Sequence, residues 1–437
     1  MNRQDASTDA AARSPRMRSP DRSQVDPNPK AIDDLIPPEH EARLVWELVQ
    51  DLNMSALYDQ IKAVEGHAGR PPIDPRELTA LWLYATIEGI ASARKLYRRC
   101  YDCDPFKWIR GGVDVNYHTL SDFRTNHPEW LKEQVVANIA AIRAEGLADL
   151  DTIGQDGMRV RASAGSASFK KAETLERLLE EAEQRWDDLQ EEFEQETELS
   201  ARQQAAQERA AREKIERLKQ AQEEVKQVVR QREKRKKGDG ASARASTTDA
   251  ESRRMKMGDG GFRPAYNVEF ATDLNNLVIV GADLINAGSD SGQMEPMVQQ
   301  IEAEQSPLSE DAEYYVDGGF STKEDIESVG QRGVTVFAPV KELKKQEQQG
   351  KDPYAAKPGD SPEVAAWRER MGTAEAKEKY KQRSKTEWSN AECRNRGLQQ
   401  FLVRGLAKVK SVVMWYVLIH NLLRMVALRA ERVQVAA

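Results

Sequence analysis

The chain contains few cysteines and few histidines. Of its 437 residues, three are cysteine and five are histidine. Three cysteines cannot build a disulfide framework, and a reducing cytoplasm would need none. Cys100 and Cys103 form a C-x-x-C, but no second pair or histidine cluster with zinc spacing accompanies it. We therefore interpret Cys100 and Cys103 as ordinary helix cysteines rather than as a metal or redox pair.

The chain also lacks an uninterrupted apolar stretch typical of a signal peptide or a membrane span. Residues 1–31 are rich in charge, Ser and Pro, which predicts a disordered tail. The run Ser411–Leu428 is long enough to cross a membrane, but it contains His420, Asn421 and Arg424. This predicts a buried helix, a cytoplasmic protein and no membrane partner.

The charge is of both signs but unevenly distributed. The net charge of −7, taken alone, argues against a nucleic-acid partner. However, the acids concentrate between Glu173 and Glu198, and from Arg394 to Arg432 the only acid is Glu431. Basic residues also outnumber acids from Arg230 to Arg263. Local basic surfaces are what phosphate contacts require, so the average charge does not exclude DNA.

Residues 32–148 have a helical pattern and predict an all-helical DNA-binding domain. Asp74 and Pro75 suit an N-cap and first turn, and Gly89 suits the end of that helix. A second helix is expected at 92–103, a third at 118–125 with Thr119 or Ser121 as cap, and a fourth at 128–145. The spacing resembles a helix-turn-helix. Its candidate DNA contacts are Arg94, Lys95, Arg98, Arg99 and Arg124.

Residues 149–170 are predicted to hold a first strand, at 150–157, and residues 171–240 an inserted helical hairpin. Apolar residues from Leu175 to Phe193, and again from Ala211 to Val229, repeat in steps of three and four. The first arm is acidic and the second basic, which favours two antiparallel helices paired within one chain. A long coiled coil between two chains is the alternative.

Beyond residue 240 the apolar period changes to that of strands. Residues 241–340 predict strands at 266–272, 277–285, 314–317 and 334–340, with helices at 291–302 and 322–331. Residues 341–379 are polar and predict an irregular insertion. Residues 380–430 predict helices, the first from Tyr380, then 398–406 and 412–428. The whole is an α/β chain with an all-α N-terminal part.

Three acids stand out by position. Asp156 and Asp317 are each expected at the end of a strand and precede glycine, where open α/β sheets place active sites. Glu387 follows Tyr380 and Arg383 and precedes Arg394 at offsets that put all four on one helix stripe. Each has a simpler explanation: Asp-Gly is turn chemistry, and Glu387 suits an exposed ion pair.

Taken together, these residues resemble a known family. The pattern from Tyr380 through Arg383 and Glu387 to Arg394 resembles the signature around the last acid of DDE-type insertion-sequence (bacterial) transposases. The order Asp156, Asp317, Glu387 is similar to that of their ribonuclease-H-like core. The likeness covers most of residues 70–425, and Arg394 stands where lysine is more usual.

The resemblance implies an α/β fold: a ribonuclease-H-like mixed sheet flanked by helices, with the all-α N-terminal domain and an inserted antiparallel coiled-coil hairpin. It implies binding of terminal inverted repeats, then metal-dependent DNA cleavage and strand transfer. Asp156, Asp317 and Glu387 would hold two Mg²⁺ or Mn²⁺ ions about 3.5–4 Å apart. Further DNA contacts would come from Tyr380, Arg383, Arg394 and Arg396.

The implied partners are double-stranded DNA, both element ends and target, and further copies of the chain in a homodimer or larger synaptic assembly at the bacterial nucleoid. Two alternatives stay open. One is a metal-dependent nuclease of the same fold without strand transfer, which binding to transposon ends would discriminate. The other is a domesticated, non-catalytic DNA-binding protein, against which the three intact acids argue.

Overall fold

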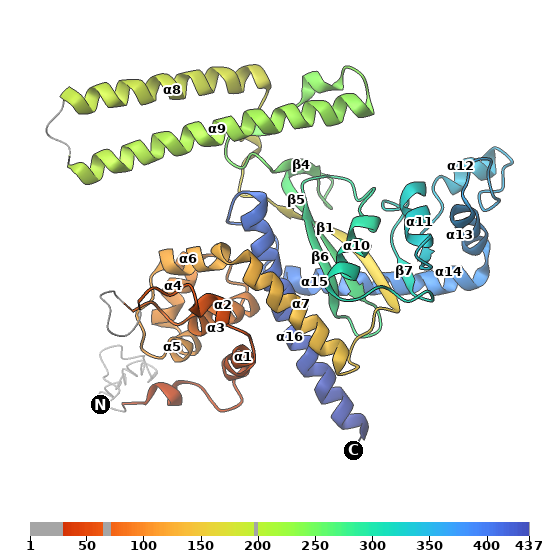
Figure 1. Cartoon of the computed structure of the whole chain (residues 1–437), viewed down its shortest axis with the longest axis horizontal. Helices are drawn as coiled ribbons and strands as arrows, with labels where there is room; N and C mark the ends of the chain where they lie inside the picture. Colours follow the sequence, from red (N-terminus) through yellow and green to blue (C-terminus); the bar gives the residue numbers. More distant parts are fainter. Residues whose placement is uncertain (1–28, 64–70, 196–199, 437) are drawn as a thin grey trace, which may run out of the picture.

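The computed structural model describes residues 29–63, 71–195 and 200–436, so nearly all of the predicted tail at 1–31 lies outside the described residues. A helical N-terminal part, a central sheet and a projecting pair of long helices are distinct in Figure 1. The N-terminal elements are a 3-10 turn at Ile32–Leu35, α1 (Glu41–Gln50), α2 (Ser55–Tyr58), α3 (Pro75–Ile87), α4 (Ala93–Asp102), α5 (Asp104–Arg110), α6 (Tyr117–Asn126) and α7 (Pro128–Ala144).

Local capping explains where these helices begin. The Asp74 side chain accepts a hydrogen bond from the Arg76 amide at 2.8 Å, and Pro75 occupies the first turn, as predicted. The prediction for α6 is wrong, because Asn116 caps it rather than Thr119 or Ser121. Helix α5 was not predicted, since its seven residues are too few to show a helical period.

The sheet has six strands in a mixed arrangement: β1 (Thr152–Arg161), β4 (Arg253–Lys256), β5 (Phe262–Asp273), β6 (Ile279–Ile285), β7 (Glu313–Tyr315) and β8 (Thr335–Phe337). β1 pairs antiparallel with β5 on one side and parallel with β7 on the other, and β8 extends the parallel side. β4 and β6 both pair with β5, along different parts of its length. Helices α10 (Met294–Glu304) and α11 (Lys323–Gly330) connect β6, β7 and β8.

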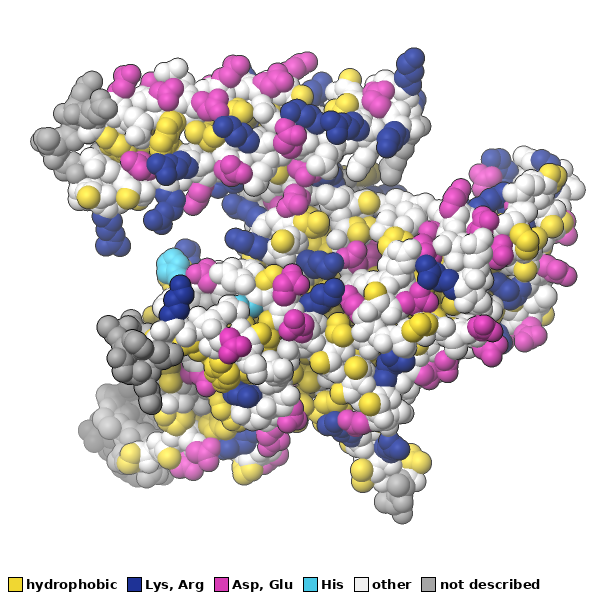
Figure 2. Space-filling view, viewed as in Figure 1, with side chains coloured by type: hydrophobic (Ala, Val, Ile, Leu, Met, Phe, Trp, Pro, Cys, Tyr) yellow, Lys and Arg dark blue, Asp and Glu magenta, His cyan; other side chains and the backbone are white. Residues whose placement is uncertain are grey.

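Two long helices, α8 (Ala172–Gln195) and α9 (Ala201–Arg235), lie side by side between β1 and β5 in the sequence (Figure 1). Their contacts include buried Leu175 and Ala182 of α8 against Leu218 and Val225 of α9, in an apolar cluster separate from the main core. A short ladder of β2 (Phe169–Lys170) with β3 (Ala245–Ser246) closes their base. In the space-filling view the pair stands off from the N-terminal helices across an open notch (Figure 2).

The C-terminal third is more helical than expected. Residues 341–379, predicted as an irregular insertion, contain α12 (Leu343–Gln348), α13 (Pro362–Gly372) and α14 (Ala374–Tyr380). Trp367 of α13 is buried and donates to the Ala338 carbonyl, which explains how a polar segment packs. Tyr380 ends α14 rather than beginning a helix; a 3-10 turn at Lys381–Lys385 leads into α15 (Thr386–Asn395). The helix predicted at 398–406 is absent, because Gly397 and Gly405 adopt positive φ there.

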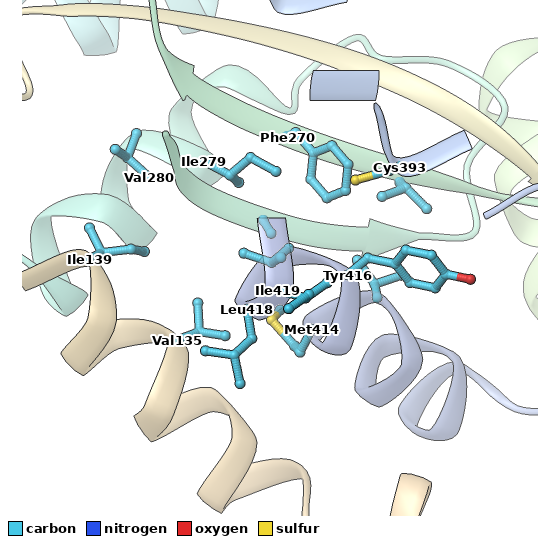
Figure 3. Close-up of a cluster of buried hydrophobic side chains, with 14 of the residues drawn as sticks. Val135, Ile139, Phe270, Ile279, Val280, Cys393, Met414, Tyr416, Leu418 and Ile419 are labelled. Carbon is cyan, nitrogen blue, oxygen red and sulfur yellow. The ribbon is translucent and has the colours of Figure 1, made fainter. Parts of the chain in front are cut away.

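The last helix, α16 (Leu406–Ala436), runs through the centre of the main core. Its apolar side chains meet those of α7, β5, β6 and α15 in Figure 3, with Tyr416 and Ile419 almost wholly buried. This helix is long and apolar enough to cross a membrane, but 78% of its most apolar window is buried inside the protein. The prediction of a buried helix is confirmed.

Candidate active site

The site begins with a close approach between β1 and α15. A Cβ atom on Gly154 of β1 would lie 2.4 Å from Cγ2 of Thr386 on α15, so only glycine permits this spacing. Further along α15, the Ser389 and Thr272 hydroxyls are 3.3 Å apart. Because side chains alternate along a strand, Asp156 faces the same side as Gly154, toward α15.

Asp156 lies among groups that are far away in the sequence. Its Oδ1 accepts from Arg383 Nη2 at 2.8 Å, across 227 residues of chain. Its Oδ2 accepts from Asn390 Nδ2 of α15 at 3.0 Å. Arg383 also donates through Nη1 to Glu387 Oε1 at 3.1 Å. One guanidinium therefore joins the first and last of the predicted acids.

Asp156 was expected at the end of its strand, but β1 continues to Arg161 because β5 still pairs with it there. The parallel pairing with β7 covers only Thr152 to Gly154, so Asp156 lies just beyond that paired part. Asp317 follows β7 by two residues and is half-buried. Both aspartates are therefore near the point where the parallel part of the sheet ends.

The side chain of Tyr380 connects the segment that precedes Glu387 to the backbone next to Asp317. Its hydroxyl donates to the carbonyl of Val316, the residue before Asp317, at 3.2 Å. Burial raises the pKa of Tyr380, and Asp317 and Asp156 raise it further against the effect of Arg383. Tyr380 is thus a neutral, half-buried hydrogen-bond donor to the backbone next to Asp317.

The electrostatics of Asp156 reflect this crowding. Burial raises its pKa, the Arg383 guanidinium opposes that rise, and the Asp317 and Glu387 carboxylates add to it. The exposed fraction of the side chain is 16% for Asp156 and 19% for Arg383, but 67% for Glu387. Asp156 is therefore largely shielded from solvent, whereas Glu387 on α15 is open to it.

Within residues 29–63, 71–195 and 200–436, no three Asp, Glu, His or Cys side chains are grouped closely enough to hold a metal ion. Arg383 instead occupies the space between Asp156 and Glu387. The donor set is carboxylate oxygen only, without sulfur or imidazole, which suits a hard cation such as Mg²⁺.

The other residues near Glu387, including the predicted DNA contacts Arg394 and Arg396, lie in different surroundings. Arg394 is exposed. Arg396 is partly buried and pairs with Glu392 Oε2 at 3.0 Å. Trp388 is 40% exposed and lies edge-on to His420, with ring centroids 5.5 Å apart. Burial lowers the pKa of His420 to about 4, in keeping with a neutral core histidine.

The basic residues of α4 are largely at the surface. Arg94, Lys95 and Arg98 are exposed, and Arg99 is partly exposed and lies 3.5 Å from Asp102. Arg94 also lies over the ring of Tyr117. Arg124 is different and the expectation of a DNA contact is wrong for it: it is 4% exposed, donates to the Ala91 carbonyl and lies over the Trp82 ring. Its role is structural.

The sequence patterns did not predict two features of the site. Asn390 follows Glu387 by one helical turn, and that spacing was the available signal for its contact with Asp156. Gly154 gave no signal, because its importance depends on how closely Thr386 approaches from another segment.

Comparison with known protein families is consistent with this arrangement. The family model described as Transposase domain (DUF772) matches residues 30–126, and that described as Transposase DDE domain matches residues 235–422. Asp317 and Glu387 lie inside the second match, whereas Asp156 and the α8–α9 pair up to residue 234 lie outside both. No curated protein and no solved structure matches the chain.

Proposed function

Because this chain belongs to the DDE transposases of insertion sequences, we propose that Asp156, Asp317 and Glu387 are its catalytic acids. The observation that carries the proposal is the convergence of three distant segments. Arg383 bonds both Asp156 and Glu387, and Tyr380 bonds the backbone beside Asp317. If Asp156 and Asp317 only formed turns, or if Glu387 only formed an exposed ion pair, these distant residues would not need to be in contact.

Each residue has a distinct proposed task. Asp156 and Asp317 provide buried and half-buried carboxylate oxygens from the sheet, and Glu387 provides a solvent-facing one from α15. Asn390 orients Asp156 through its amide. Arg383 offsets part of the negative charge of the acids and, with Tyr380, would contact a phosphate of the DNA backbone.

Divalent metals such as Mg²⁺ are generally used by this family, and we propose two ions held by the three acids. When bound, such a pair activates an attacking oxygen and stabilises a leaving oxygen in displacement at phosphorus. The chain itself supplies hard oxygen ligands at one end of the parallel strands. Strand cleavage at element ends and strand transfer to target DNA are the proposed reactions.

The strand order supports a ribonuclease-H-like core. The strands β6, β5, β1, β7 and β8 lie side by side in that order. The pairings of β6 with β5 and of β5 with β1 are antiparallel, and those of β1 with β7 and of β7 with β8 are parallel. In this proposal residues 149–170 and 241–340 form the core, 380–430 complete it, and 171–240 are a coiled-coil hairpin inserted between its first two strands. Residues 341–379 are an insertion, and 32–148 a separate DNA-binding domain.

DNA is the proposed partner of two surfaces. The exposed face of α4 bears Arg94, Lys95 and Arg98 and would position element ends through phosphates. Arg394 is exposed beyond Glu387 and would contact DNA near the scissile phosphate, with Arg396 beside it. Two element ends brought together need at least two copies of the chain, so we propose a homodimer or larger assembly acting in the cytoplasm.

The test uses four alanine variants: Asp156→Ala, Asp317→Ala, Glu387→Ala and, as a matched control on the same helix, Glu392→Ala. Cleavage and strand transfer would be measured on duplexes carrying an element end with Mg²⁺ or Mn²⁺, and binding to the same duplex without metal. We expect the first three to lose cleavage while keeping binding, and the control to keep both.

The control distinguishes chemistry from helix stability, because Glu392 also forms an ion pair, with Arg396. A wild-type cleavage rate in any one of the three acid variants would refute the proposed acid set. Cleavage without joining to target DNA in the unmodified protein would favour the nuclease alternative.

A further inference from the structure

A second polar group lies behind the aspartates, on the opposite face of β1 from α15. Gln155 and Gly157 alternate with Asp156 and face this side. Gln155 is fully buried; it accepts from the Tyr314 hydroxyl at 2.9 Å and donates to the Gln293 carbonyl at 3.1 Å. These bonds connect β1 to β7 and to the start of α10.

The centre of this group is Asp290, in the loop between β6 and α10. Its Oδ1 accepts from Asn267 Nδ2 at 2.6 Å, and Asn267 is fully buried on β5. Asn267 Nδ2 is also 2.6 Å from Glu269 Oε1. On the other side, Asp290 Oδ2 lies 3.6 Å from Arg159 Nη2 of β1. The carboxylate is thus held from two strands.

Asp290 also lies against two glycines. A Cβ on Gly157 would lie 2.6 Å from Asp290 Oδ1, and a Cβ on Gly319 would lie 3.3 Å from Asp290 Oδ2. Neither glycine has a positive φ, so backbone conformation does not explain why they lack a side chain. At Gly157 the nearest atom that a Cβ would meet is Asp290 Oδ1, and at Gly319 it is Asp317 Oδ1 at 2.8 Å, with Asp290 Oδ2 next.

The two glycines adjoin the proposed catalytic aspartates. Gly157 directly follows Asp156, and the Gly319 amide donates to Asp317 Oδ1 at 2.6 Å. We propose that Asp290 is a positioning residue: its carboxylate packs between these two glycines and fixes the distance and orientation of Asp156 relative to Asp317. The role extends the proposed function, because it matters only if both aspartates act together.

The position of Asp290 in the β6–α10 loop allows it to keep the two aspartates at a fixed spacing. Two acids at the ends of separate strands must keep one spacing, yet like charges repel one another. Asp290 is anchored by Asn267 and Arg159 rather than by either aspartate. It can therefore hold both glycine backbones without competing for the cations that the aspartates would share.

The test compares Asp290→Ala, Asp290→Asn and Asp283→Ala in the full-length protein. Asp283 is a matched control on β6, since it too forms an ion pair, with Lys410 at 2.6 Å. Mn²⁺ affinity would be measured by calorimetry without DNA, together with melting temperature and the Mn²⁺ concentration that gives half-maximal cleavage.

We expect Asp290→Ala to weaken Mn²⁺ binding by about 10- to 100-fold, the range typical for outer-shell partners of metal ligands. Asp290→Asn keeps the volume between the glycines and should lose less. Asp283→Ala should bind Mn²⁺ as the unmodified protein does. Gly157→Ala, which places a methyl group 2.6 Å from Asp290 Oδ1, should resemble Asp290→Ala.

Mn²⁺ affinity within twofold of the unmodified protein in Asp290→Ala, with only a lower melting temperature, would reduce Asp290 to a structural role and overturn the inference. Should Asp290→Ala fail to fold, the Mn²⁺ affinities of Asp290→Asn and Gly157→Ala decide: if both lie within twofold of the unmodified protein, the inference is overturned. Loss of cleavage in Asp156→Ala with no metal effect in any Asp290 variant would leave the proposed function intact and refute this inference alone.

Discussion

Arg383 shows how one side chain sets the chemistry of the site. It is the only basic partner that the described residues give to Asp156, and it also pairs with Glu387. A buried carboxylate without a cation favours its protonated form. The guanidinium therefore favours the ionised form of Asp156, and its single positive charge offsets part of the negative charge of the three carboxylates.

We predict that Arg383→Ala slows cleavage by roughly 100-fold, the lower end of the cost of removing one preorganised hydrogen-bond donor to developing charge in a transition state. The pKa of Asp156 is already raised by burial and would rise further without the guanidinium. Since Asp156 must be ionised, the acid limb of the pH–rate profile should move to higher pH. Arg383→Lys should keep the limb near its original place; an unshifted limb in Arg383→Ala would contradict the argument.

Glu77 offers a residue-scale prediction outside the site. This side chain of α3 is 5% exposed, and burial, with Asp74, raises its pKa from 4.5 to about 7 against the effect of Arg110. The folded protein therefore binds a proton that the unfolded chain has already lost, so the free energy of unfolding falls as pH rises from 4.5 toward 7. The loss is on the order of 3 kcal/mol.

Glu77→Gln should remove this dependence, stabilising the protein at pH 8 and changing little at pH 4.5. The measurement is urea unfolding at both pH values, with Glu47→Gln, an exposed acid of α1, as the control. Equal effects of Glu77→Gln at the two pH values would show that the pKa of Glu77 is the same in the folded and unfolded states and would contradict the prediction.

At the scale of elements, the α8–α9 pair has a core of its own, and a largely buried ion pair between Glu224 of α9 and Arg253 of β4 connects it to the sheet. Its buried side chains form their own cluster, and the β2–β3 ladder brings its two ends together. Replacing residues 172–236 by a short Gly/Ser linker should therefore leave the sheet and α16 folded. DNA binding should weaken, and the slope of log K against log salt should become shallower, because the basic residues of α9 are removed.

The matched comparison keeps the helices and changes their charge: Arg230→Glu with Lys234→Glu, both exposed on α9. The same shallower slope in that variant would assign the effect to charge rather than to shape. An insoluble protein after the deletion would mean that the pair belongs to the main hydrophobic unit.

Elements with strong periodicity or capping could be predicted from sequence. Pro75–Ile87, Ala93–Asp102 and the buried α16 follow from their caps and apolar patterns. Short or polar elements could not, since α5 has seven residues and α13 depends on Trp367 reaching the Ala338 carbonyl. Of the site, the sequence indicated candidate acids, but Asn390 and Asp290 gain their positions only from segments that pack together.

At the scale of the whole molecule, α16 joins the two halves of the chain. On one side, Ser411 and Trp415 donate to the Arg124 carbonyl at 3.0 Å. On the other, the Asn421 side chain pairs with both backbone groups of Ile279, at 2.9 and 2.8 Å, and so satisfies the free edge of β6. The N-terminal helices thus share a core with the sheet, although they are proposed as a separate functional domain.

This shared core predicts cooperative unfolding. Trp415 is 1% exposed and its ring centroid lies 6.1 Å from Phe123 and 6.2 Å from Trp130, so Trp415→Ala would open a cavity where α6, α7 and α16 meet. We expect a loss of about 3–5 kcal/mol in the free energy of unfolding. Calorimetry should show the helices and the sheet melting in one transition, in both the unmodified protein and the variant.

Val433→Ala, at an exposed position near the end of the same helix, is the control and should change little. Two separate transitions, with Trp415→Ala lowering only the one assigned to residues 32–148, would mean that the N-terminal helices fold on their own and that α16 belongs to the sheet alone.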